Sequence, residues 1–139
     1  MFALMQSAHV ESLHLSVDPL TGLKAVIAIH SSRLGPALGG CRYLAYPNDE
    51  SAVNDAIRLA QDMSYKAALA GLAVGGAKAV IMRAAHVESR AALFEAFGRC
   101  VEQLDGRYIT AIDSGTSTAD MDCIAQSTRH VTSTTAAGD

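Results

Sequence analysis

The sequence predicts a three-layer α/β/α fold, in which helices cover both faces of a mostly parallel sheet and a β-hairpin comes first in the chain. Runs of β-branched and apolar residues alternate with longer segments whose apolar residues have helical spacing. Such alternation is typical of parallel sheets with helices on both sides. The 139 residues, half of them apolar, suffice for one domain with a buried core.

The first predicted elements are the two strands of the hairpin. Residues 12–17 (SLHLSV) alternate in polarity, DPLTG forms a turn, and residues 23–30 (LKAVIAIH) are rich in β-branched side chains. The next segment, residues 31–43 (SSRLGPALGGCRY), contains three glycines and a proline. We expect a loop there, because this segment is too interrupted for a helix.

A long helix and a buried strand follow the loop. Asn48 is a favourable N-cap, and apolar residues at helical spacing extend the helix to about residues 65–69. Glycines then break the helix before a short strand at residues 77–82 (AKAVIM), which lacks polar alternation after its lysine and is therefore expected to be buried.

The remaining elements repeat this alternation. A second helix is predicted at about residues 88–104 and a strand at residues 107–112 (RYITAI). A short third helix capped by Thr116 or Ser117 and a weak strand at residues 129–132 (RHVT) complete the set.

Composition argues against several classes of protein. Acidic and basic residues are intermixed and the formal net charge is −3, so we expect no nucleic-acid partner, which would need a basic stripe. No apolar stretch approaches the roughly 20 residues of a membrane span, and the N-terminus is a poor signal peptide. Cys41, Cys100 and Cys123 lie far apart, outside any Cys/His cluster. These features indicate reduced thiols in a cytoplasmic protein without a metal site.

The glycine-rich segment MSYKAALAGLAVGGAKAVIM (residues 63–82) does not fit a nucleotide-binding loop. In a P-loop a lysine directly follows the second glycine, but Ala77 has that position and Ala79 offers no hydroxyl for Mg²⁺. The dinucleotide fingerprint G-x-G-x-x-G is absent from the whole sequence. We therefore expect no cofactor-binding residues in this chain.

Two lysines bracket the apolar part of the same segment. A chain reversal at the glycines would bring Lys66 and Lys78 to one cleft, where each positive charge disfavours the other. One lysine would then be available as a base, and the other would bind a carboxylate. On spacing alone, lysines that extend to water are the simpler interpretation.

Asp113 is the strongest acidic candidate. It follows the strand RYITAI, and ligands of open α/β sheets bind at the carboxyl ends of strands. Asp-Ser-Gly is also a common turn sequence, so both interpretations stay open. We interpret Asp120 and Asp122 as capping or solvated residues, and His30 as a structural residue.

Several segments together resemble the N-terminal domain of the leucine, phenylalanine and valine dehydrogenases, which belong to the glutamate dehydrogenase-like superfamily. In chain order, over about residues 18–132, they are DPLTGLKAVIAIH, GPALGGCR, AIRLAQDMSYKAALAGLAVGGAKAVI, AFGRCVEQLDGRYITAIDSGT and ADMD. The resemblance implies an NAD-dependent oxidative deamination of an L-amino acid to the 2-oxo acid and ammonia. It also implies a homo-oligomer, because this domain makes subunit contacts in the family.

The resemblance also implies roles for individual residues. Lys66 corresponds to the lysine that binds the substrate carboxylate, Lys78 to the catalytic lysine that activates water, and Asp113 to the aspartate that transfers protons at the amino group. A neutral Lys78 would repel the cationic iminium intermediate less than an ammonium would. The remaining substrate-binding positions that the resemblance implies are Leu38, Gly39, Gly40, Met63 and Ala111, of which Met63 also fits a core position on the apolar helix face.

Some positions depart from the family pattern. Ala77 replaces a glycine before the catalytic lysine, Ile112 replaces an acid common in leucine enzymes, and Ser114 replaces a common valine. Phenylalanine enzymes tend to have glycine where Ala111 stands, so a branched aliphatic substrate such as leucine or valine is favoured.

Family enzymes are more than twice as long as this chain. We expect residues 1–132 to form the substrate-binding and dimerisation domain and residues 133–139 to begin an interdomain hinge. NAD would be bound mainly by a domain absent from this chain, which alone would be inactive. The alternative hypothesis is a non-catalytic module that keeps the fold for dimerisation or amino-acid binding.

Overall fold

Five strands form one sheet in the computed structural model, which describes residues 1–136. Their order across the sheet is β1-β2-β4-β3-β5. β2 is antiparallel to β1 and β4, whereas β3 is parallel to β4 and β5, so four strands point the same way. This confirms the mostly parallel sheet with an N-terminal hairpin. The strands are β1 (Ser12–Asp18), β2 (Leu23–Ile29), β3 (Ala37–Leu44), β4 (Gly75–Met82) and β5 (Tyr108–Ala111).

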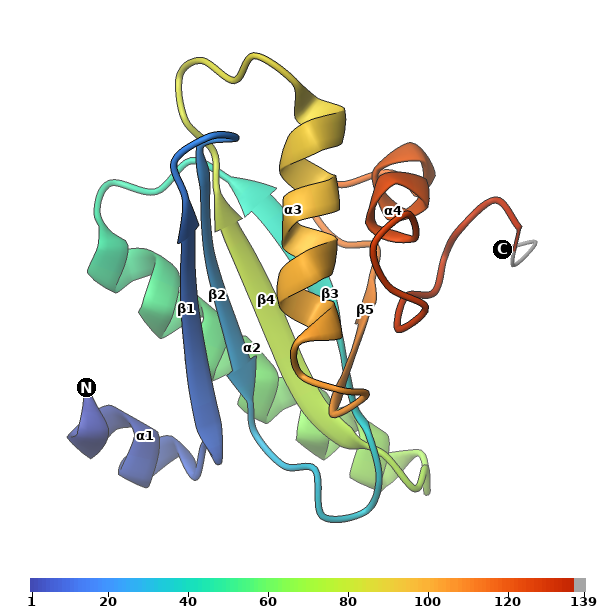
Figure 1. Ribbon diagram of the computed structural model, residues 1–139. Coiled ribbons are helices and arrows are strands. Elements are labelled where there is room, and N and C mark those ends of the chain that lie inside the picture. The colour runs from blue at the N-terminus through green and yellow to red at the C-terminus, as the bar shows by residue number, and fades with distance from the viewer. Residues whose placement is uncertain (137–139) are drawn as a thin grey trace.

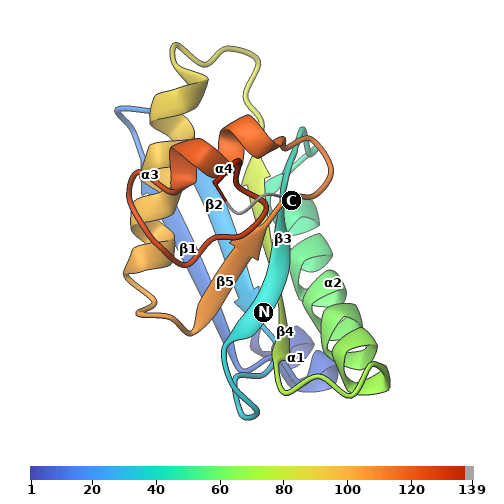
Figure 2. The ribbon, with the colours of Figure 1, turned by 90° about the vertical axis from the view of Figure 1, so that its right-hand side faces the viewer.

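Helices lie on both faces of the sheet, which confirms the three-layer architecture. α3 and α4 lie in front of the sheet in Figure 1, and α2 lies behind it; Figure 2 shows the layers from the side. Within residues 1–136 the helices are α1 (Phe2–Ala8), α2 (Asp49–Leu69), α3 (Arg90–Glu102) and α4 (Thr118–Ile124). None of them is long and apolar enough to cross a membrane.

The sheet separates two apolar cores. On the α2 side, small side chains of the helix pack against β2 and β4. On the α3 side, Phe94 and Phe97 of α3 pack against Tyr108 and the odd-numbered residues of β2 and β4. The two faces of each central strand are thus distinguished by residue parity. This parity decides on which side each candidate site residue lies.

Side-chain caps begin α2, α3 and α4, and those of α2 and α4 lie where the sequence predicts them. The Asn48 side chain accepts a hydrogen bond from the Ser51 amide at 2.8 Å and begins α2. Ser117, rather than Thr116, caps α4 and forms a capping box with Asp120.

The predicted loop at residues 31–43 is confirmed only for residues 31–36, because Ala37–Leu44 form β3 in the interior of the sheet. The glycines do not interrupt this strand; they permit close approaches. A Cβ on Gly39 would lie 1.6 Å from the Ala77 carbonyl oxygen, and the Tyr108 hydroxyl donates to the Gly39 carbonyl at 2.8 Å. Glycine inside a strand therefore marks close backbone packing here.

Other boundaries also differ from expectation. β4 begins at Gly75, so Lys78 lies within the strand and not at its start. The predicted strand at residues 129–132 is reduced to one bridge between Val131 and Thr110. Residues 2–8 form α1, which the sequence analysis did not anticipate. The predicted hinge at residues 133–139 lies partly outside the described residues.

Candidate active site

Strand parity places the predicted site residues of the strands on the face of the sheet that α2 partly covers, except Gly39, which shares the parity of Ala37 and Cys41 and lies toward α3. Val80 of β4 belongs to the α2-side core, so Lys78 points to the same side. Ala37 and Cys41 belong to the α3-side core, so Leu38, Gly40 and Arg42 of β3 face α2. Gly40 pairs with Ala111 of β5, which precedes Asp113 by two residues.

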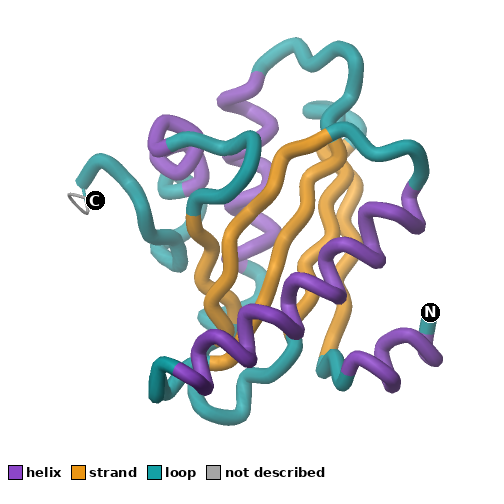
Figure 3. The backbone as a smooth tube through the Cα atoms, turned by 180° about the vertical axis from the view of Figure 1, so that it is seen from behind, coloured by secondary structure: helices purple, strands orange, loops and turns teal. Residues whose placement is uncertain are grey.

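The α2 side of β3 and β5 is the more open part of this face. Figure 3 shows α2 crossing the sheet diagonally while part of the sheet beside it stays uncovered. Leu38, Ile109 and Ala111 are half-buried there, whereas Tyr108 and Thr110, on the other side of β5, have no exposed surface. A small molecule can therefore approach this face beside α2.

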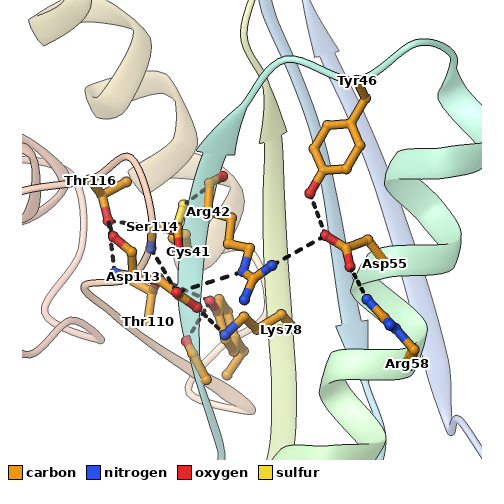
Figure 4. A network of polar contacts seen from close by, with 12 residues as sticks. Cys41, Arg42, Tyr46, Asp55, Arg58, Lys78, Thr110, Asp113, Ser114 and Thr116 are labelled. Carbon is orange, nitrogen blue, oxygen red and sulfur yellow. Dashed lines mark hydrogen bonds and ion pairs between the residues drawn. The ribbon is translucent and has the colours of Figure 1, made fainter.

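Lys78 and Asp113 form an ion pair at the edge of this opening (Figure 4). Lys78 is only 6% exposed, and the residue that pairs with it in β2 is Ala28. A buried ammonium group is stabilised only if it is paired, and Asp113 supplies the charge that does this. The partner of Lys78 is thus a carboxylate, so this lysine does not extend to water as spacing alone had favoured.

The loop after β5 fixes Asp113 on the backbone of β3. The Asp113 amide donates to the Thr116 hydroxyl at 2.9 Å, and that hydroxyl donates to the Cys41 carbonyl at 3.0 Å. A Cβ on Gly40 would lie 2.7 Å from the Cβ of Asp113. Glycine at position 40 is therefore needed for Asp113 to lie against the strand. Gly40 contributes this space, whereas the Gly39 carbonyl accepts from the Tyr108 hydroxyl and does not contact Asp113.

Opposing influences act on the pKa of Asp113. Burial raises this pKa. The hydrogen bonds from Lys78 and the Ser114 amide and the positive charges of Lys78 and Arg42 lower it by more, so the pKa of Asp113 falls below its ordinary value. Asp113 is therefore a carboxylate near neutral pH, positioned to accept a proton.

Lys66 lies in the last turn of α2, exposed to solvent. It borders a pocket of about 150 Å³ that also includes Leu38 and Met63, so three predicted substrate-binding residues meet there. Met63 was also interpreted as a core residue; it is half-buried and reaches the pocket. Within residues 1–136, no acidic group pairs with Lys66. The full lining is Leu38, Met63, Lys66, Ala67, Leu72, Val74 and Gly75.

This pocket and the Lys78–Asp113 pair are neighbours along β3. Leu38 borders the pocket, and Gly40, two residues further on the same side of the strand, abuts Asp113. Two residues of a strand span about 7 Å. A ligand about the size of an amino acid can therefore contact Lys66 at one end and Asp113 at the other.

A hydrogen-bonded serine holds α2 against β4 close to these groups. The Gly76 amide donates to the Ser64 hydroxyl at 2.8 Å, and that hydroxyl lies 2.7 Å from His30 Nδ1. A Cβ on Gly76 would lie 2.1 Å from the Ser64 nitrogen, so only glycine allows this approach. His30 therefore makes a structural contact through Nδ1, while its Nε2 is buried without a hydrogen-bond partner in the described part of the chain. The Ser64 contact fixes Met63 and Lys66 relative to Lys78.

A polar network that the sequence did not predict lies beyond Asp113. Arg42 of β3 lies between Asp113 and Asp55, and Asp55 contacts Tyr46 and Arg58 (Figure 4). The signal was present, because an arginine inside an otherwise apolar strand is unusual. Arg42 belongs to the motif GPALGGCR, but no role was assigned to it. No set of three or more His, Cys, Asp or Glu side chains in residues 1–136 is arranged to hold a metal ion.

Fold and site together define an α/β domain that holds a buried lysine–aspartate pair beside an apolar pocket with an exposed lysine. The chain belongs to the Glu/Leu/Phe/Val dehydrogenase family, whose dimerisation-domain model matches residues 8–130. This confirms the resemblance that the sequence motifs indicated.

Named relatives agree with this assignment. The chain is 49% identical to leucine dehydrogenase of Geobacillus stearothermophilus over 132 residues, which are 95% of this chain and 36% of that protein. It is 51% identical to valine dehydrogenase of Streptomyces albus over 127 residues, 91% of this chain and 35% of that protein. The chain thus spans about a third of the length of these relatives.

Solved structures show the same fold. A crystal structure of L-tryptophan dehydrogenase from Nostoc punctiforme matches with a TM-score of 0.89 and 39% identity, over 94% of this chain and 39% of the other. A hetero-hexameric glutamate dehydrogenase from Thermus thermophilus matches with a TM-score of 0.75 over 99% of this chain and 41% of the other. At 20% identity, the second likeness supports the fold alone.

Proposed function

We propose that residues 1–132 are the substrate-binding domain of an NAD-dependent amino-acid dehydrogenase, which deaminates an apolar L-amino acid to the 2-oxo acid and ammonia. The observation that carries the proposal is the buried Lys78–Asp113 pair beside the pocket of Lys66. The names of the leucine and valine dehydrogenases among its relatives support this class of substrate.

Each group in the site has a part in this reaction. Lys66, exposed and unpaired within the described residues, binds the substrate α-carboxylate. Asp113 accepts and returns protons at the amino group, and NAD would accept the hydride that leaves the α-carbon to give the iminium. Lys78, in its neutral form, takes a proton from the water that attacks the iminium carbon. Ammonia then leaves and the 2-oxo acid remains. The low polarity around Lys78 strengthens these charge interactions.

The apolar pocket favours a branched aliphatic side chain. Leu38 and Met63 supply its apolar surface, and its volume of about 150 Å³ suits a side chain of moderate size. Ala111, half-buried beside Gly40, narrows the same face. Leucine and valine are therefore the proposed substrates.

The described residues do not fit a dinucleotide. A nucleotide-binding unit has a glycine-rich turn between strand and helix, but the β4–α3 connection, RAAHVES, contains no glycine. NAD, the proposed electron acceptor, would be held mainly by a further domain joined after the proposed hinge at residues 133–139.

The domain also offers a surface for a homo-oligomer. β1 is an edge strand, and its outer backbone groups pair with no strand of residues 1–136. Leu15 and Val17 expose 58% and 71% of their surface there. An exposed apolar edge strand is a template for pairing with a second copy. Sedimentation analysis of Leu15→Lys tests this surface, since the charge should shift the protein to a smaller species.

The experiment that tests the proposed function begins with the reading frame that contains this chain. The protein encoded by the full reading frame should reduce NAD with leucine or valine. The absorbance of NADH measures this turnover. Lys78→Ala should remove this turnover, whereas Lys24→Ala, an exposed lysine of β2, should leave it unchanged. Turnover near wild type in Lys78→Ala would contradict the assigned role. A reading frame that stops at Asp139 would favour the non-catalytic module.

A further inference from the structure

Arg42 places a second positive charge on Asp113. Its Nε lies 3.6 Å from Asp113 Oδ1, while Lys78 contacts the other oxygen, Oδ2. The Ser114 amide donates to Oδ1 at 2.6 Å. The carboxylate is therefore held on both oxygens, by one cation on each.

Arg42 is itself held by α2. Its Nη1 lies 3.5 Å from Asp55 Oδ2, and the Tyr46 hydroxyl donates to the same oxygen. Arg58 donates to the other Asp55 oxygen at 2.7 Å. Burial raises the pKa of Asp55, but the hydrogen bonds of Tyr46 and Arg58 and the charges of Arg42 and Arg58 lower it below its ordinary value. An ionised carboxylate thus fixes the guanidinium between the helix and Asp113 (Figure 4).

Arg42 is shielded from water at its Nε, where it faces Asp113. Its side chain is 25% exposed, and its Nε is buried without a hydrogen-bond partner in the described part of the chain. Such a group is tolerated when nearby negative charge offsets its loss of water. Asp113 supplies this charge for Nε, and Asp55 supplies it for the other end of the guanidinium.

The two cations beside Asp113 differ in chemistry. An arginine stays protonated throughout the accessible pH range, whereas a lysine exchanges its proton in base catalysis. In the proposed reaction Lys78 must release and take up a proton, so its charge is not constant. Arg42 provides a positive charge that does not change during the reaction.

We propose that Arg42 is a positioning residue for Asp113: its permanent charge keeps the carboxylate ionised and oriented toward Lys78 while Lys78 exchanges its proton. The proposal rests on the proposed dehydrogenase function for its catalytic consequence. The effect of Arg42 on the ionisation of Asp113 concerns this chain alone and can be measured without enzyme turnover.

Two further titratable groups near Asp113, on β3 and β5, are neutral. Burial raises the pKa of the Cys41 thiol on β3 and of the Tyr108 hydroxyl on β5, so neither carries a charge near neutral pH. The Asp55 carboxylate on α2 faces Asp113 only across Arg42. Lys78 and Arg42 are therefore the charges that set the ionisation of Asp113.

The first test is an NMR titration of the Asp113 carboxyl group in this chain. Arg42→Met should raise the pKa of Asp113, Arg42→Lys should leave it near the wild-type value, and Asp55→Asn, which frees the guanidinium, should raise it less. Arg33→Met, at an exposed arginine of the β2–β3 loop, is the control. Circular dichroism verifies that each variant is folded. A pKa that is identical in Arg42→Met and wild type overturns the proposal.

The second test uses the active dehydrogenase that carries this domain. Arg42→Met should lower kcat about 10-fold with little change in KM and move the acidic limb of the kcat–pH profile to higher pH, and Arg42→Lys should restore most of kcat. A raised KM with unchanged kcat overturns the positioning role. If no variant, wild type included, reduces NAD, the proposed function fails while the NMR result still decides the effect of Arg42 on the ionisation of Asp113.

Discussion

Asp113 and Asp120 lie seven residues apart, and each pairs with a cation, but their surroundings differ. Asp120 accepts hydrogen bonds from Arg90 at 2.8 and 2.7 Å, and from the amide and hydroxyl of Ser117. Asp113 has Lys78 on one oxygen, a longer contact to Arg42 and the Ser114 amide on the other, and an open face of the sheet beside it.

The cations show the same contrast. Arg90 is half exposed and lies over the rings of Tyr43 and Phe94, so it joins α3 to α4 with its charge near water. Lys78 is nearly inaccessible. Burial of a lysine is unfavourable unless its ammonium group is paired, and a buried, paired lysine beside an open face is a candidate for proton transfer away from bulk water. A saturated carboxylate with an exposed partner indicates structure, and an accessible carboxylate with a buried lysine indicates a reactive site.

The largest expected effect separates the two aspartates by activity. Asp113→Asn removes the proton acceptor and should lower kcat about 1,000-fold in the dehydrogenase that carries this domain. Asp120→Asn should keep kcat within about 2-fold, because Asp120 lies on the α3 side of the sheet. Steady-state kinetics of NAD reduction measure both. Equal losses in the two variants would show that the contrast between the sites has no catalytic meaning.

Much of the fold could be predicted from local signals. The caps at Asn48 and Ser117 and the apolar periodicity of α2 are local, and the structure confirms them. β3 could not be predicted in this way, because its glycines are explained only by contacts with Ala77 and Asp113 from other elements. Local patterns report the conformation of a segment and not which backbone will approach it.

The candidate site divides along the same line. Spacing left open whether Lys66 and Lys78 share a cleft or extend to water, and it did not indicate that Lys78 pairs with Asp113, 35 residues further along the chain. The network of Arg42 and Asp55 joins a strand to a helix and leaves no local pattern. The resemblance of the motifs predicted which residues belong to the candidate site, whereas the pairing of the strands shows which of them lie close together.

The second expected effect concerns stability. Asp120→Ala removes the capping box of α4 and both hydrogen bonds from Arg90, so it should lower the free energy of unfolding by about 2 kcal/mol. Urea denaturation monitored by circular dichroism measures this change. The control is Asp122→Ala, since Asp122 on the same helix lies at the surface and bonds only Thr135 among the described residues. A loss in Asp122→Ala as large as that in Asp120→Ala would contradict the structural role of Asp120.

The smallest expected effect is a pH dependence that both aspartates share. For Asp120, burial raises the pKa, but Arg90 and Ser117 lower it below the ordinary value, and Lys78, Ser114 and Arg42 do the same for Asp113. A carboxyl group whose pKa is lower in the folded state stabilises the fold above its unfolded pKa of about 3.9. This stabilisation is lost as the pH falls through the folded pKa. The free energy of unfolding should therefore decrease below about pH 4.

Urea denaturation between neutral pH and pH 3 measures this decrease. Asp120→Asn should reduce its slope, because an amide carries no titratable proton and the lowered pKa of Asp120 no longer contributes. Asp113→Asn should reduce the slope as well, but it should also destabilise the fold at neutral pH by leaving the Lys78 ammonium buried without its carboxylate. Both aspartates thus contribute to the free energy of unfolding at low pH, but only Asp113 also belongs to the candidate site. An acid slope that is the same in both variants and in wild type would assign the pH dependence to other groups.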